Sequence, residues 1–177
     1  MITFKLRFPK AEVPKWSSRY DAAQDEHLLN VIKPGVDRRG YLQRDEFLMV
    51  CRWKTPRSQP RCSRNDPQEI EAVTKIALSP ATPDRLKIQI LTLLSGVGWP
   101  TASVILHLFD AAHFPILDYR ALWSLRRDLP SQYGYDFWHE YTQFTRALAV
   151  DVGCGMRTLD RALWQYSKEN QLTGARD

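Results

Sequence analysis

The sequence predicts an all-α protein, because apolar residues recur at helical spacing and because helix-start signals alternate with breaks rich in proline and glycine. Asp66-Pro67, for example, places a capping residue directly before a proline, a pair that favours the start of a helix. The chain has 177 residues, of which 44% are hydrophobic, and this suffices for a hydrophobic core. We see no internal repeat and no low-complexity segment, so we expect residues 1–177 to form a single helical domain.

The expected elements follow one another with short connections. Apolar and polar side chains alternate from Ile2 to Phe8, and Pro9 and Pro14 follow, so we expect residues 1–18 to form a short extended N-terminal arm. Helical spacing of apolar residues predicts the helices that come after it, over residues 19–32, 43–54, 67–78, 100–109, 118–127, 135–150 and 155–168. One more helix, which Thr82 or Asp84 caps, is expected to end at Leu94.

Two breaks are expected between the early helices. Lys33-Pro34-Gly35 is expected to end the helix over residues 19–32, since proline and glycine both interrupt helices. Residues 55–67 contain Pro56, Pro60 and Pro67 and are expected to form a loop.

The charge of the chain favours a polyanionic partner. The formal net charge is +5, although proteins that bind no polyanion also carry such a charge. Five positive charges and no acid fall within residues 52–64, which we call the basic segment: Arg52, Lys54, Arg57, Arg61 and Arg64. A solvated loop would have the same composition. We expect a nucleic-acid contact here, with Arg57 and Arg61 as the binding residues.

Several classes of protein are not expected. Cys51, Cys62 and Cys154 are widely spaced and form no CxxC pair, which indicates reduced thiols. The four histidines have no metal-ligand spacing, and we see no nucleotide or flavin motif, so we expect no metal and no cofactor. No apolar run approaches the roughly 20 residues that span a membrane. The chain start also lacks the apolar centre of a signal peptide, so we expect a cytoplasmic protein. We also expect it to be a monomer.

The most informative stretch runs from Leu94 to Ala102 and contains Gly96-Val97-Gly98 between two expected helices. Two glycines one residue apart permit a tight turn with positive φ and close approach of another backbone. The amides at the start of the second helix lie at the positive end of its dipole, and this arrangement binds anions such as nucleic-acid phosphate. A plain corner between two helices would need the same glycines, and Gly-x-Gly alone is a weak signal.

These residues, with Asp118 eighteen positions after Pro100, resemble the helix-hairpin-helix of the DNA glycosylase superfamily. That superfamily includes endonuclease III, the adenine glycosylases and the alkylation-repair glycosylases, and the resemblance covers residues 86–126. It implies double-stranded DNA as partner and backbone amides of the turn as phosphate ligands. The matching residues are Ser95, Gly96, Val97, Gly98, Trp99 and Thr101. The resemblance also implies that carbonyls of residues 94–99 are candidates for holding a monovalent cation.

The resemblance further implies that Asp118 is catalytic. Cleavage of an N-glycosidic bond builds positive charge on the sugar, and a fixed carboxylate stabilises that charge and orients or deprotonates the attacking water. Asp is also a preferred N-cap residue, so capping alone would explain Asp118, and both roles can hold at once. Trp53, Lys54 and Tyr119 are the expected base-pocket residues, because flipped bases lie between aromatic faces and contact a few polar groups. Ordinary packing is the alternative for the aromatic residues.

Two departures from the family refine the expected reaction. Bifunctional relatives carry a nucleophilic lysine at the position of Pro100, and proline has no amine to attack the sugar. Many endonuclease III relatives carry a four-cysteine loop for an iron–sulfur cluster, and only Cys154 lies in that region here. We therefore expect an enzyme, a monofunctional glycosylase of base-excision repair that uses water. The alternatives are a non-catalytic DNA-binding relative and an all-α protein-interaction module.

Overall fold

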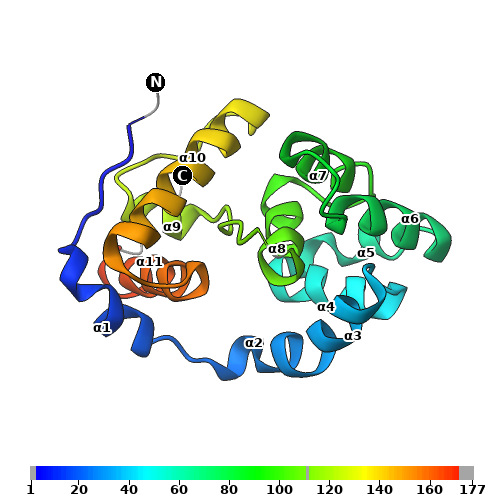
Figure 1. The fold of residues 1–177 in the computed structure, drawn as a ribbon, viewed down its shortest axis with the longest axis horizontal. Helices are drawn as coiled ribbons and strands as arrows, with labels where there is room; N and C mark the ends of the chain where they lie inside the picture. Colours follow the sequence, from blue (N-terminus) through cyan, green and yellow to red (C-terminus); the bar gives the residue numbers. More distant parts are fainter. Residues whose placement is uncertain (1–2, 111, 172–177) are drawn as a thin grey trace. The chain divides into compact units, whose positions relative to one another are not determined.

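The computed structural model describes residues 3–110 and 112–171 (Figure 1). These residues form helices joined by short connections, and no strand is assigned among them, which confirms the all-α prediction. The contacts divide the chain into two compact units. Unit 1 comprises residues 1–21 and 115–177, and unit 2 comprises residues 22–114, where the sequence predicts a single domain.

Unit 2 is built around α8 (Trp99–Phe109), which α3, α4, α6 and α7 all contact (Figure 1). Eight residues of α8 are buried, from Thr101 to Phe109, so this helix forms the centre of the core. The other elements of the unit are α2 (Ala23–His27), η2 (Leu28–Ile32), α3 (Lys33–Arg39), α4 (Arg44–Lys54), η3 (Pro56–Ser58), α5 (Gln59–Cys62), α6 (Pro67–Leu78) and α7 (Asp84–Leu91).

The start of α6 follows the predicted signal, and α4 begins with a capping box that was not predicted from the sequence. Gln43 and Glu46 form a capping box at α4, each side chain accepting from the other residue's backbone N–H. At α6 the Asp66 carboxylate accepts the N–H of Gln68 at 2.8 Å, and Pro67 occupies the first turn.

The predictions of two breaks in unit 2 are wrong in part. The first helix begins at Ala23 and continues past Lys33-Pro34-Gly35 through the π-helical turn η2 into α3. Pro34 lies near the start of α3, directly after the π-helical turn, and Gly40, with φ +78°, ends the helix instead. The expected loop over residues 55–67 contains η3 and α5, with a proline in the first turn of each.

Unit 1 consists of an N-terminal segment and helices from both ends of the chain. They are η1 (Lys10–Glu12), α1 (Val13–Ser18), α9 (Tyr119–Ser124), α10 (Tyr135–Val152) and α11 (Met156–Asn170). The expected extended arm over residues 1–18 is therefore helical from Lys10 onward, because Pro14 suits the first turn of α1. Residues 1–2 of that arm lie outside the described residues.

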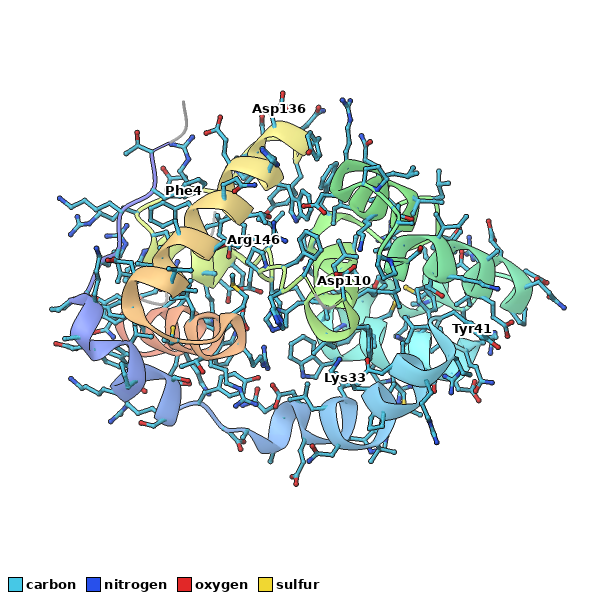
Figure 2. All side chains as sticks on the ribbon, viewed as in Figure 1. Phe4, Lys33, Tyr41, Asp110, Asp136 and Arg146 are labelled. Atoms are coloured by element: carbon cyan, nitrogen blue, oxygen red, sulfur yellow. The ribbon has the colours of Figure 1, made fainter. Side chains whose placement is uncertain are left out.

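The N-terminal segment is attached to unit 1 by backbone bonds and by aromatic rings. Lys5 and Arg7 donate their N–H groups to the carbonyls of Leu125 and Ser124, at 3.0 and 2.9 Å. Phe4 is buried against α10, with its ring 5.3 Å from that of Phe144 (Figure 2). The apolar positions of the expected arm thus belong to the core of this unit.

Candidate nucleic-acid interface

The hairpin turn, residues 92–98, joins α7 to α8. Gly96 has φ +82°, and the N–H of Val97 donates to the carbonyl of Leu94 at 3.0 Å, so residues 94–97 form a tight turn. Gly98 is extended, with φ −96° and ψ 178°, and precedes the first residue of α8. Only one of the two glycines therefore needs the left-handed conformation that the sequence suggests for the pair.

The first turn of α8 begins at the surface. Trp99 is half-buried and the preceding Gly98 is exposed, whereas the side chain of Thr101 is buried. Ala102 donates its N–H to the carbonyl of Gly98 at 2.9 Å, which is the first bond of this helix. The N–H groups of Trp99 and Thr101 belong to the first turn and have no acceptor inside α8, while Pro100 has no N–H. The positive end of the α8 dipole therefore lies beside the turn.

Asn65 holds the hairpin turn against α5. Its side-chain oxygen accepts the N–H of Ser95 at 2.7 Å, and its amide nitrogen donates to the carbonyls of Ser95 and Cys62 at 2.9 and 2.8 Å. The Ser95 amide, expected to bind phosphate, is thus engaged with Asn65, and the Val97 amide is engaged within the turn. Of the expected phosphate ligands, the amides of Gly96, Gly98, Trp99 and Thr101 remain as candidates.

Gly96 also meets α5 directly. A Cβ atom at this position would lie 2.7 Å from the Sγ of Cys62, 2.9 Å from the Cys62 nitrogen and 3.1 Å from the Cβ of Arg61. Only glycine permits this approach. Neither Asn65 nor this contact could be predicted from the sequence, because an asparagine directly after the basic segment gives no local signal of them.

The contact with α5 brings the basic segment to the hairpin turn. Arg61 is exposed on α5, one residue before Cys62, and Arg57 is exposed on η3. Arg52 and Arg64 are exposed as well. Unit 2 therefore places exposed guanidinium groups and the start of α8 on neighbouring elements, although about 40 residues of sequence separate them.

The expected base-pocket residues are divided between the two units. Trp53 and Lys54 are half-buried at the C-terminal end of α4 in unit 2. Tyr119 is the first residue of α9 in unit 1 and is half-buried as well. Neither unit on its own brings the three side chains together.

Asp118 caps α9. One carboxylate oxygen accepts the N–H of Arg120 at 2.8 Å, so the capping interpretation holds, and the side chain is half-buried. Burial and the neighbouring Asp118 charge raise the pKa of Tyr133 to about 12. Burial first, and then the charges of Asp160 and Asp118, raise the pKa of Tyr141, whose hydroxyl donates to the carbonyl of Ile116 at 2.8 Å. Asp118 is therefore a carboxylate near two neutral phenols, neither of which the sequence analysis identified.

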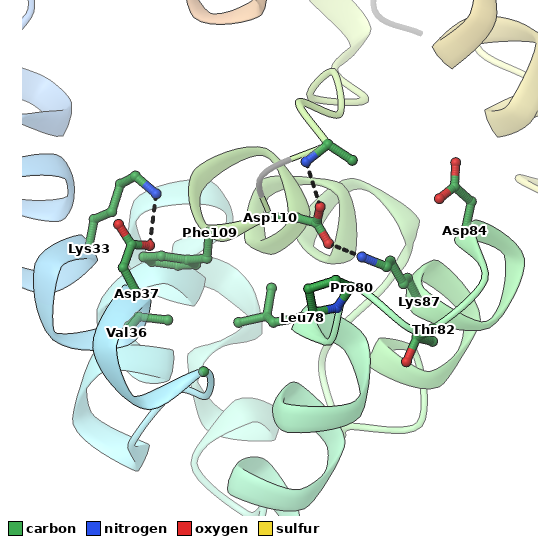
Figure 3. Close-up of a pocket in the computed structure, with 12 residues that line it drawn as sticks. Lys33, Val36, Asp37, Leu78, Pro80, Thr82, Asp84, Lys87, Phe109 and Asp110 are labelled. Carbon is green, nitrogen blue, oxygen red and sulfur yellow. Dashed lines mark hydrogen bonds and ion pairs between the residues drawn. The ribbon is translucent and has the colours of Figure 1, made fainter.

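A pocket of about 690 Å³ lies at the opposite end of α7 and α8 from the hairpin turn (Figure 3). On its wall the ammonium of Lys87 pairs with the carboxylate of Asp110, and both side chains are almost fully buried. The second oxygen of Asp110 accepts the N–H of Ala112 at 2.8 Å. On the α3 side of the pocket, Lys33 pairs with Asp37, one turn further along the same helix, at 2.9 Å. The Lys87 amine is therefore engaged away from the hairpin turn, and neither Trp53 nor Lys54 lines this pocket.

The comparisons with known proteins leave the family unassigned. No family model, no curated protein and no solved structure matches the chain. In the part of the chain that the structure describes, no helix is long and apolar enough to cross a membrane. Over the same residues, His, Cys, Asp and Glu side chains form no group of three or more that could hold a metal, and all three cysteines are free thiols.

Proposed function

We propose that the protein binds double-stranded DNA and hydrolyses the N-glycosidic bond of a damaged or mismatched base. The observation that carries this proposal is the contact between the hairpin turn and α5. This contact places the start of α8, which attracts anions, beside the exposed arginines of the basic segment. Phosphate is the anion that a helix start and arginines bind together.

The proposed chemistry rests on Asp118. Loss of the base leaves positive charge on the sugar, and the Asp118 carboxylate stabilises that charge and orients the attacking water. Its hydrogen bond from the N–H of Arg120, at 2.8 Å, fixes the position of the carboxylate at the start of α9. Because Pro100 has no amine, the product is an intact strand with an abasic site rather than a cleaved strand.

Replacement of Arg57 and Arg61 by Ala tests the binding half of this proposal. Binding of a fluorescent duplex is measured by anisotropy at increasing salt. The slope of log affinity against log salt is expected to become shallower by about 1 for each lost phosphate contact, because fewer counterions are released. If the salt slope equals that of the unmodified protein, Arg57 and Arg61 do not contact DNA phosphate.

A non-catalytic DNA-binding protein is the second candidate. Asp118 already satisfies an N–H of α9, so a structural role accounts for its presence without chemistry. The two candidates differ in whether product forms when the protein is in excess over the duplex. Absence of any salt-sensitive DNA binding would favour the third candidate, a protein-interaction module.

A further inference from the structure

A further pocket, of about 480 Å³, lies in unit 1 between the N-terminal segment and α10, and we call it the α10 pocket. Its apolar lining consists of Phe4, Leu6, Phe144, Ala147 and Leu148. The rings of Phe4 and Phe144 are 5.3 Å apart, so the packing of the segment on the helix forms part of its wall (Figure 2). The hairpin turn and the basic segment belong to unit 2, so the proposed function makes no use of this pocket.

The N-terminal segment has the alternation of extended backbone. Phe4 is buried, whereas the neighbouring Lys5 is exposed. The N–H groups of Lys5 and Arg7 both donate to carbonyls of residues 124–125. Successive N–H groups of an extended chain point to opposite edges, so those of Phe4 and Leu6 point away from residues 124–125. Neither of these two N–H groups has an acceptor among the described residues, and we call them the free edge.

A free edge of extended backbone is a template on which another extended chain adds as a strand. In this mode of recognition, backbone hydrogen bonds supply affinity, and pockets for alternate side chains supply selectivity. Unit 1 has both parts in one place, because Phe4 and Leu6 carry the free edge and also line the α10 pocket. The combination therefore fits an extended peptide with an apolar side chain.

Charge decides which extended chain fits. Lys5 lines the α10 pocket and has no carboxylate partner among the described residues, whereas Lys10 at the same pocket pairs with Asp151. A second copy of this segment would bring Lys5 and Arg7 close to their own copies, and like charges on paired strands are destabilising. Carboxylates on the incoming chain would instead attract the Lys5 ammonium. The charges therefore favour an acidic peptide over a second copy of the chain.

We propose that the free edge and the α10 pocket together bind an extended, acidic peptide segment of a partner protein. The N–H groups of Phe4 and Leu6 donate to carbonyls of the peptide, an apolar side chain of the peptide enters the α10 pocket, and a carboxylate accepts from the Lys5 ammonium. This interaction goes beyond the proposed function and does not depend on it, since it uses neither the hairpin turn nor the basic segment nor Asp118.

Amide hydrogen exchange, followed by NMR, tests the free edge in the protein alone. The amides of Lys5 and Arg7 are expected to exchange slowly, because they are hydrogen-bonded, and those of Phe4 and Leu6 are expected to exchange faster. Slow exchange at Phe4 and Leu6 would show that the edge is already occupied and would overturn the proposal.

Binding is tested by selecting random short peptides, displayed on phage, against the whole protein. The selected peptides are expected to alternate apolar with polar residues and to be rich in Asp and Glu. When synthesised and added to the protein, they are expected to slow the exchange of the Phe4 and Leu6 amides. Failure to enrich any peptide, or enriched peptides that leave this exchange unchanged, would overturn the proposal.

Leu6→Pro removes one N–H of the free edge and leaves those of Lys5 and Arg7. It is expected to lower affinity for a selected peptide about tenfold or more, because a backbone bond and a side-chain contact are lost. The control, Leu6→Val, keeps the N–H and is expected to keep most of the affinity. Thermal unfolding followed by circular dichroism reports on the fold of both variants.

Ala147→Glu tests the α10 pocket independently of the backbone. Ala147 is exposed on α10, so the helix tolerates the change, and the new side chain fills the pocket and repels an acidic peptide. Gln143→Glu adds the same charge to an exposed position of the same helix outside the lining of the pocket. A selected peptide is expected to lose affinity for Ala147→Glu and to retain it for Gln143→Glu. Equal affinity for these two variants would overturn the proposal.

Discussion

Gly96 is the most constrained residue of the hairpin turn. It combines a positive φ with a backbone approach to Cys62, so both its conformation and its lack of a side chain are required. Gly98 has neither requirement, since its φ is −96° and the nearest atom to an added Cβ is 3.8 Å away. The two glycines of one motif therefore serve different purposes.

Gly96→Ala is expected to lower the free energy of unfolding by about 2 kcal/mol or more, from the strained backbone and the overlap with Cys62. Gly98→Ala, the matched control, is expected to cost less than about 1 kcal/mol. Urea unfolding followed by circular dichroism measures both. Equal losses for the two variants would contradict the described turn.

The charge of Asp118 has its own signature in the titration of Tyr133. Burial and the Asp118 charge raise the Tyr133 pKa to about 12, so Asp118→Asn is expected to lower it towards its ordinary value of 10.0. Asn retains the N-cap, so the helix remains. Carbon NMR of ring-labelled tyrosine follows this titration. A Tyr133 pKa that does not change would show that no Asp118 charge reaches this phenol.

The raised pKa of Tyr133 also gives the direction in which pH changes the stability of the fold. The folded protein favours the neutral phenol of Tyr133, because its pKa is raised above that of the unfolded chain. This contribution to stability is complete below about pH 10 and is lost as the pH rises towards about 12.

At the scale of elements, the Lys87–Asp110 ion pair joins α7 to the end of α8 at the pocket. Both side chains are almost fully buried, so removal of one partner leaves a buried charge without its counter-charge. The sequence offered no sign of this pair, because 23 positions separate the two residues and only the packing of α7 on α8 unites them.

Lys87→Met is expected to lower the free energy of unfolding by about 3–5 kcal/mol, since it leaves the Asp110 carboxylate buried and unneutralised. Adding Asp110→Asn removes that charge while keeping an acceptor for the N–H of Ala112, so the double variant is expected to recover part of the loss. Equilibrium unfolding of the three proteins gives the coupling energy. Strictly additive losses would contradict a buried ion pair.

Local signals predicted most elements of the fold. The cap at Asp66 and the apolar spacing of α4 and α10 lie within single segments, and the structure has helices at all three. Proline was the main source of error. The sequence suggests breaks at Pro14, Pro34, Pro56 and Pro60, whereas each stands near the start of a helical element.

At the scale of the whole molecule, the sequence predicted one domain and the contacts form two units. Unit 1 unites the two ends of the chain, and α1 packs on α11 although more than 130 residues lie between them. The bond from Asn65 to Ser95 also joins residues that are far apart in the sequence. Such features arise from tertiary packing, and local periodicity contains no information on them.

The central claim is that Asp118 drives hydrolysis of an N-glycosidic bond. The most direct test incubates excess protein with a panel of duplexes, each with one modified or mismatched base, and then applies hot alkali to cut at abasic sites. We expect strand cleavage only after alkali, on at least one duplex, and its loss in Asp118→Asn with DNA affinity retained. Cleavage that persists undiminished in Asp118→Asn, or no cleavage of any bound duplex, would contradict the account.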